Sequence, residues 1–271
     1  MKFSILIAHY NNSNYFKDCY ESLISQTYPN WEAIILDDGS EGNEKSAIKS
    51  LIDGDPRFKF FENEQNSGVG YTKAKLIELA SGDICGFVDP DDAIGKNAIE
   101  TLISQFTKKE IVAVYSQLYF CDQNLQITQL LKNSTQIKNN NRYFFNITFN
   151  VNHFFSFRKE NYLQTEGIDC LLSSAVDQDL YLKLYETGDF KFVKEPLYLY
   201  RRHDSGVSQD LNKKVKLYKN WNQVLLNTCK RRGLSKIGNR EVSNISNLAE
   251  FIYENQNTLL TRIRRKLQSF L

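Results

Sequence analysis

The chain has 271 residues, of which 41% are hydrophobic and 13% aromatic, with a formal net charge of +2. This composition excludes a disordered chain, and the length suffices for one large domain with an appendage. No apolar run is long enough for a membrane-spanning helix, and Lys2 leads straight into a short strand, so we expect neither a transmembrane segment nor a signal peptide. Five scattered cysteines without a paired spacing indicate reduced thiols in a cytoplasmic protein.

Strand-like and helix-like segments alternate through the first part of the chain. The expected strands are Phe3–Ala8, Trp31–Leu36, Phe58–Phe61 and Ile84–Val88. The expected helices between them are Tyr15–Ser25, Glu44–Ile52 and Tyr71–Ala80. This alternation predicts βαβ units and an α/β fold with a mostly parallel central sheet flanked by helices.

The second part of the chain is less regular. A helix over Lys96–Phe106 and a strand over Ile111–Phe120 continue the alternation, and the Asn-rich stretch 122–150 is expected to be an irregular surface loop. The later expected elements are a strand over Phe154–Arg158, a helix over Asp177–Glu186 and a strand over Leu197–Arg201. From Lys213 onward the pattern is helical, with no further strand signal.

Three carboxylates, Asp89, Asp91 and Asp92, directly follow the expected strand Ile84–Val88. Ligands of open α/β sheets bind beyond the carboxyl ends of the strands. Clustered carboxylates repel one another, so a bound cation is the natural way to hold them together, and hard oxygen ligands suit Mg²⁺ or Mn²⁺. The alternative is an acidic turn with Pro90 at its corner.

Polar residues also follow the first two expected strands and should meet the acids at the same sheet edge. Tyr10 can stack on a base, and Asp38 can accept a hydrogen bond from a base N–H. Asn66-Ser67-Gly68 offers a backbone turn near this edge. Each feature alone is also consistent with a turn or a helix cap, but together they predict a nucleotide site.

This ordered set of motifs resembles family 2 glycosyltransferases of the GT-A fold, over about residues 2–208. The matching segments are Ser4–Asn11, Ser22–Tyr28, Glu32–Ser40, Asn66–Gly68, Ala80–Asp83 and Asp89–Asp91, the last being the DxD motif. Ala8 and His9 depart from the Pro and Thr that are usual there. The resemblance implies a GT-A catalytic domain over 1–209, with a donor half at about 1–120 and an acceptor half at about 121–209. A basic helical C-terminal extension follows over 210–271.

The resemblance also implies roles for individual residues. Val176–Leu180 resembles the family's Glu-Asp-x-Asp-Leu motif, which makes Asp177 the general base that deprotonates the acceptor hydroxyl. Asp179 is expected to brace the local fold. The alternative is that Asp177 only caps its helix.

Arg201-Arg202-His203 resembles the family's Tyr-Arg-x-His segment, so His203 is expected to complete the metal site with Asp91, or else to serve as a loop hydrogen-bond donor. Lys73 replaces a frequent Arg and can still pair with phosphate. His9 and His153 are interpreted as structural. The expected donor-binding residues are Ala8, Tyr10, Asn11, Asp38, Asn66, Lys73, Asp89, Pro90, Asp91 and Arg201.

The implied activity is inverting transfer of a sugar from a nucleotide-sugar, with UDP the expected nucleotide, to a hydroxyl of a saccharide or lipid-linked acceptor in cell-surface polysaccharide or glycoconjugate assembly. The Gln-x-x-Arg-Trp motif of processive synthases is absent, which favours single additions. A sugar nucleotidyltransferase is one alternative, although Ala8–Ser13 lacks the glycines and lysines of a phosphate loop. A non-catalytic sugar- or lipid-binding module is the other. No nucleic-acid partner is expected, and a homo-oligomer is compatible with the sequence.

The C-terminal segment is strongly basic. Residues 211–271 carry thirteen Lys and Arg against three Glu, a net charge of +10, which leaves −8 for the remainder. Its final stretch has an apolar stripe at helical spacing, consisting of Leu259, Leu260, Ile263, Leu267, Phe270 and Leu271. Such a helix either packs on the protein or another subunit, or lies peripherally on an anionic membrane at the cytoplasmic face.

Overall fold

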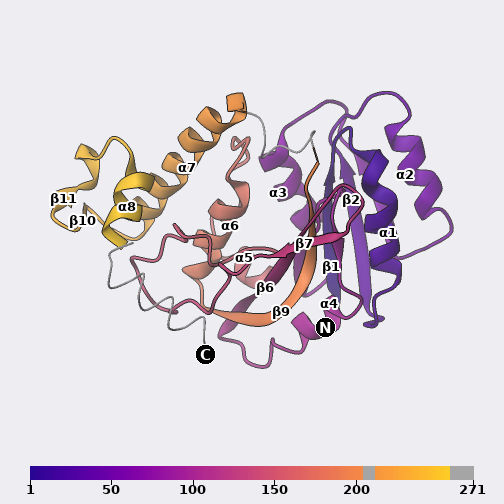
Figure 1. Cartoon of the computed structure of the whole chain (residues 1–271), viewed down its shortest axis with the longest axis horizontal. Coiled ribbons are helices and arrows are strands. Elements are labelled where there is room, and N and C mark those ends of the chain that lie inside the picture. Colours follow the sequence, from indigo (N-terminus) through magenta and orange to yellow (C-terminus); the bar gives the residue numbers. More distant parts are fainter. Residues whose placement is uncertain (204–210, 257–271) are drawn as a thin grey trace.

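A computed structural model describes residues 1–203 and 211–256, with side chains described to 203 and from 216. A nine-stranded sheet forms its centre, in the order β3-β2-β1-β4-β8-β6-β9-β5 with β7 paired to β6 (Figure 1). In Figure 1, α1 and α2 lie at one end of the molecule, and α7 and α8 lie at the other. The predicted α/β fold with a helix-flanked sheet is confirmed.

The first half follows the predicted alternation closely. Its strands are β1 (Phe3–His9), β2 (Trp31–Asp37), β3 (Phe58–Glu62), β4 (Ile84–Phe87), β5 (Ala93–Ile94) and β6 (Ile111–Cys121). Its helices are η1 (Ser13–Tyr15), α1 (Phe16–Ile24), α2 (Glu44–Ile52), α3 (Val69–Leu79) and α4 (Ala98–Ile103). The strand β5 has only two residues, too few to produce an alternating pattern in the sequence.

The second half departs more from expectation. Its elements are β7 (Ile127–Leu130), β8 (Phe155–Arg158), α5 (Lys159–Tyr162), α6 (Val176–Tyr185), β9 (Asp189–Arg201), α7 (Leu211–Arg231), β10 (Lys236–Ile237), β11 (Arg240–Glu241), η3 (Val242–Asn244) and α8 (Leu248–Gln256). β9 begins eight residues before the predicted strand at Leu197, and β7 lies inside the stretch expected to be irregular. The prediction of no strand after Lys213 was wrong, because a short antiparallel pair turns at Gly238, which has φ +57°.

The sheet is mixed. Strands β1 to β4 pair in parallel, as the βαβ alternation requires, whereas β8 pairs antiparallel with both β4 and β6. The carboxyl ends of β1, β2 and β4 therefore share one edge, and the start of β8 lies at that same edge because its direction is reversed. This geometry brings residues around 153 to the edge where the predicted site lies.

Alternate residues of the strands bury two hydrophobic cores on opposite faces of the sheet. Ile5 and Ile7 of β1 pack in the core that includes α1, α2 and α4, whereas Leu6 packs in the core that includes α3 and α6. The second core also includes Trp221 and Leu225 of α7. The described part of the predicted C-terminal extension therefore packs on the sheet domain, while the division at residue 209 stays a prediction.

The final apolar stripe, Leu259–Leu271, lies outside the described residues. Within the described ranges 1–203 and 211–256, no helix is both long enough and apolar enough to cross a bilayer.

Candidate active site

The carboxyl ends of β1 and β2 are joined by buried hydrogen bonds. Asp37 Oδ2 lies 2.8 Å from His9 Nδ1, and Asp37 Oδ1 accepts from the Ser40 amide at 2.9 Å. Ala8 lies beside Leu36 at this edge, where Asn11 Oδ1 accepts from the Glu41 amide at 3.0 Å. The Tyr10 side chain is 47% exposed, so its ring remains available to a ligand.

Asp38 ties the end of β2 to the loop before α3. Its two carboxylate oxygens accept from the amides of Ser67 and Gly68, each at 2.9 Å, and Oδ1 also accepts from Asn63 Nδ2 at 2.8 Å. The loop passes so close that a Cβ on Gly39 would lie 2.7 Å from the Asn66 backbone nitrogen. Asn66 is therefore held, exposed, beside the end of β2 as the sequence predicts.

The acidic loop after β4 contains carboxylates in different environments. Asp92 is 2% exposed and its Oδ1 accepts from the Arg201 amide at 2.7 Å, so this acid joins the loop to β9. Pro90 is buried, and the Asp89 amide donates to the Tyr198 hydroxyl at 3.1 Å. Asp91 and Asp89 are only partly buried and are the members of the cluster left facing the site.

Arg201 is 3% exposed, and each nitrogen of its guanidinium donates to a protein oxygen. Nε donates to the Asp91 carbonyl, Nη1 to the Gln123 carbonyl and Nη2 to Asp18 Oδ2, each at 2.6 Å. These contacts give Arg201 a local role in holding the Asp91 loop, and a predicted contact with the donor would have to compete with them.

His203 closes this side of the site. Its Nε2 lies 2.8 Å from Asp91 Oδ2, although 112 residues separate the two in the chain. The His203 ring also packs against Tyr15, with ring centroids 4.6 Å apart. The structure thus brings together the two residues that the sequence predicts as metal ligands.

Lys73 links the predicted general base to the acidic loop. Its buried Nζ donates to Asp177 Oδ1 at 2.7 Å and lies 3.9 Å from Asp89 Oδ1. Asp177 is the second residue of α6, whereas Lys73 belongs to α3 on the other side of the chain's midpoint. The Lys73 ammonium group therefore lies between Asp89, from the first half of the chain, and Asp177, from the second half.

The electrostatic environment differs between these two carboxyls. Burial raises the pKa of Asp177, but the Lys73 ammonium and His153 outweigh it and hold that pKa below its usual value. Burial raises the pKa of Asp89 above its usual value despite the opposing effect of Lys73. Asp177 is therefore ionised near neutral pH, as a general base must be.

His153 is a member of this neighbourhood that sequence reasoning missed. It lies close enough to Asp89 and Asp177 to lower the pKa of both, and it stacks on Tyr198 with ring centroids 4.9 Å apart. Its position just before β8 would have indicated that His153 lies at the site, if that strand had been known to run antiparallel to β4. A sheet assumed to be mostly parallel hides this relationship.

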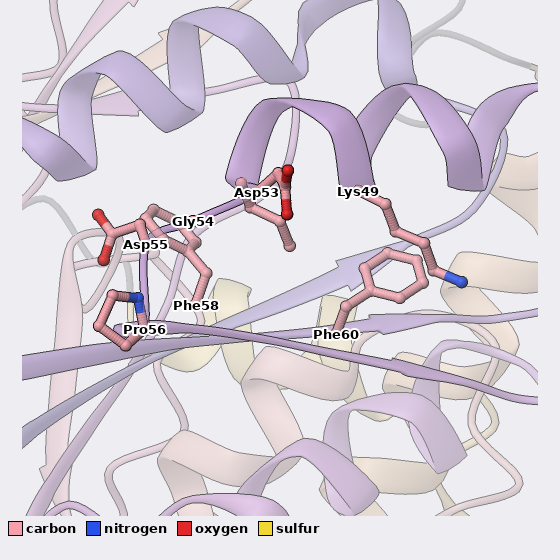
Figure 2. A pocket seen from close by; sticks show the side chains of 8 residues that line it. Lys49, Asp53, Gly54, Asp55, Pro56, Phe58 and Phe60 are labelled. Atoms are coloured by element: carbon pink, nitrogen blue, oxygen red, sulfur yellow. The ribbon is translucent and has the colours of Figure 1, made fainter.

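A separate pocket of about 530 Å³ lies elsewhere, between the end of α2 and the start of β3 (Figure 2). Lys49 and Phe60 face each other in it, with Nζ 5.0 Å from the ring centroid (Figure 2). None of the predicted site residues lines this pocket. It does not coincide with the edge where the motif residues meet.

The model of the family described as "Glycosyl transferase family 2" matches residues 4–164. This chain belongs to glycosyl transferase family 2. The match includes Asp38, Lys73 and the acidic loop, and it ends before α6. The suspected resemblance is confirmed.

Similar proteins include polysaccharide synthases. Chondroitin synthase of Escherichia coli is 28% identical over 253 residues, covering 93% of this chain and 36% of that protein. Hyaluronan synthase of Pasteurella multocida is 27% identical over 252 residues, covering 92% of this chain and 25% of that protein. The chain thus spans about a third or less of the length of these two relatives.

Solved structures of similar fold include proteins with bound nucleotide-sugars. S. aureus TarS 1–349 in complex with UDP-GlcNAc has a TM-score of 0.71 at 16% identity, over 99% of this chain and 79% of that one. The mannosyltransferase PcManGT from Pyrobaculum calidifontis, in complex with GDP-Man and Mn²⁺, has a TM-score of 0.58 at 11% identity. At these identities the likeness shows the GT-A fold alone.

Two side chains of the site, Asp91 and His203, are of kinds that Mn²⁺ accepts as ligands. Within residues 1–203 and 211–256, no group of three or more His, Cys, Asp or Glu side chains is arranged to hold a metal ion. Asp91 and His203 offer one oxygen and one nitrogen ligand within 2.8 Å of each other. Because Mg²⁺ and Mn²⁺ sites at phosphates commonly use one or two protein ligands, the remaining positions can be filled by a diphosphate and water.

Proposed function

We propose that this protein is an inverting glycosyltransferase that moves a sugar from a UDP-sugar to a hydroxyl group of an acceptor. The observation that carries the proposal is the Lys73 bridge, with Asp177 Oδ1 at 2.7 Å and Asp89 Oδ1 at 3.9 Å. It supports the proposal because the expected base lies next to the expected donor loop, where a sugar held by its diphosphate would present its anomeric carbon to an acceptor.

The donor side is assigned to residues at the carboxyl edge of the sheet. The exposed Tyr10 ring stacks on the base, and Ala8, Asn11, Asp38 and Asn66 shape the base and ribose pocket. Lys73 pairs with the diphosphate once the donor is bound, because its ammonium already faces the acidic loop. We assign Arg201 to positioning this loop, since its guanidinium is occupied by Asp18, Gln123 and Asp91.

Asp91 and His203 would hold a Mn²⁺ or Mg²⁺ ion, which when bound stabilises charge on the leaving diphosphate. The acceptor oxygen forms a bond to the anomeric carbon, and the bond from that carbon to the diphosphate oxygen breaks. Asp177 takes the acceptor proton on the side opposite the leaving group. A single displacement of this kind inverts the anomeric centre. Asp89 and Pro90 shape the loop that faces the donor.

The activity and partners of the whole protein are proposals as well. The similarity to chondroitin and hyaluronan synthases supports a saccharide acceptor, or a lipid-linked one, in surface polysaccharide or glycoconjugate assembly. The basic C-terminal segment supports contact with an anionic membrane from the cytoplasmic side. A homo-oligomer is compatible with this assignment.

The test is turnover with a panel of nucleotide-sugars in the presence of Mn²⁺, with and without EDTA. We expect metal-dependent release of nucleoside diphosphate together with a new glycosidic linkage. Release of pyrophosphate from a nucleoside triphosphate and a sugar phosphate would identify a nucleotidyltransferase instead. Binding of nucleotide-sugars without any turnover would identify a non-catalytic module.

A further inference from the structure

The turn that presents Asp177 has no side-chain cap, although the Ala175 carbonyl accepts a hydrogen bond from the Asp179 amide at 3.1 Å. Ala175, the N-cap residue of α6, has φ +59° and ψ +18°, and no side chain there forms a capping hydrogen bond. A non-glycine residue in the left-handed region is strained and persists only where the surroundings hold it. The contacts that hold this turn therefore also hold the carboxylate two residues later.

Two side-chain hydrogen bonds to the segment just before this turn come from α7, outside the part of the chain matched by the family model. Asn220 Nδ2 donates to Ser173 Oγ at 3.1 Å and to Ser174 Oγ at 2.8 Å. The next residue, Trp221, is 7% exposed and packs in the same core as Val176, the first residue of α6. One amide thus contacts two consecutive residues immediately before the turn.

The far end of α6 is held by the same helix. Arg231 Nε and Arg232 Nε lie 3.0 and 2.8 Å from the Glu186 carboxylate, and Arg232 Nη2 donates to the Leu182 carbonyl at 3.2 Å. Asn220 and Arg231 are roughly 16 Å apart along α7 at 1.5 Å per residue, which matches the length of α6. The two helices therefore run side by side in the same direction (Figure 1).

We propose that α7 is a positioning element for the general base, and that Asn220 is its key residue, acting through Ser173 and Ser174. This inference rests on the proposed role of Asp177. Without the amide, the turn at Ala175 loses its hydrogen bonds to α7 and can relax, shifting Asp177 relative to the acceptor hydroxyl. Donor binding should change little, because only one of the described residues assigned to the donor, Lys73, has a hydrogen bond to α6.

The experiment compares Asn220→Ala, the double variant Ser173→Ala/Ser174→Ala, and the triple variant that combines them. We expect kcat to fall about tenfold in each, within the roughly 10²-fold that a misplacement of 1 Å costs, with donor KM unchanged. The triple variant should be no slower than the double variant, because residues that act through one contact are not additive. Gln223→Ala is the matched control, since Gln223 is exposed on α7 and, among the described residues, its side chain bonds only to Asn227 of the same helix.

Three outcomes would overturn this inference: an unchanged kcat in Asn220→Ala, an equal loss in Gln223→Ala, or additive losses in the triple variant. A fall in kcat matched by an equal rise in donor KM would also overturn it, because that pattern indicates general loosening of the domain. Asp177→Asn is measured in parallel. If that variant keeps full turnover, the proposed function itself fails, and the two failures are thereby distinguished.

Discussion

The proposed donor side and the proposed acceptor side of the site are held in different ways. Asp91 lies at the end of a strand, where the backbone of the sheet and the Arg201 bonds fix its loop. Asp177 lies at the start of a helix, where Lys73 from α3 and Asn220 from α7 determine its surroundings. The difference teaches that donor geometry follows from sheet topology, whereas base geometry depends on packing between distant segments.

The largest loss of transfer activity is expected from a substitution on the proposed donor side. Asp91→Asn should lower metal-dependent transfer about 10⁴-fold or more, because a bound cation supplies several kcal/mol of charge stabilisation. Steady-state turnover with Mn²⁺ measures this loss. Asp83→Asn is the control, since Asp83 lies just before β4 at its opposite end and accepts from the Lys2 amide. Wild-type turnover that is unaffected by EDTA would contradict the prediction.

A somewhat smaller loss of transfer activity is expected from a substitution on the proposed acceptor side. Asp177→Asn should lower kcat about 10²–10⁴-fold, the usual contribution of a general base, with donor KM little changed. The matched control is Glu160→Gln, which removes an exposed carboxylate on α5. A large rise in donor KM would place Asp177 in the donor site and erase the contrast between the two sides.

The pH dependence of kcat tests the ion pair between Lys73 and Asp177, which links the two proposed sides. Lys73 and His153 lower the pKa of Asp177 against the opposing effect of burial, so Lys73→Met should raise that pKa. Because the base acts when ionised, the acidic limb of the kcat profile should move to higher pH. Lys75→Met serves as the control, since the Lys75 side chain is 41% exposed on α3 and pairs with Glu78. If the acidic limb of the kcat profile stays at the same pH, the general base is a different group.

The smallest effect on activity is expected from a substitution that loosens the loop containing Asp91. Arg201→Lys removes the planar fork that reaches Asp18, Gln123 and Asp91 together, and should lower the free energy of unfolding by about 1.5–3 kcal/mol. Urea unfolding measures the change, and the Mn²⁺ concentration for half-maximal turnover should rise. Arg202→Lys, at an exposed neighbour, is the control. Equal effects in the two variants would remove Arg201 from its positioning role.

Much of the donor side could be predicted from the sequence because strand ends of a parallel sheet converge. Tyr10, Asp38 and Asp91 follow β1, β2 and β4, and the structure brings them to one edge. Asp91 and His203 were paired only through the family resemblance, and the 2.8 Å contact agrees with it. The predicted limits of helices and strands in the first half agree with the structure within a few residues, because the hydrophobic patterns there alternate clearly.

What could not be predicted depends on long-range contacts. Nothing near Arg201 in the sequence indicates that Asp18, 183 residues away, would engage its guanidinium. Lys73 was expected to meet phosphate, yet its nearest carboxylate is Asp177, which is 104 residues away. His153 reaches the site only because β8 runs antiparallel to β4, a pairing that local patterns do not encode.

The central claim is that Asp91 and Asp177 serve different halves of one reaction. Calorimetric titration of UDP with Mn²⁺ into the two Asn variants tests it most directly. The account predicts that Asp177→Asn binds UDP with wild-type affinity, whereas Asp91→Asn loses the part of the affinity that depends on Mn²⁺. Loss of UDP binding in Asp177→Asn, or unchanged Mn²⁺-dependent binding in Asp91→Asn, would contradict it.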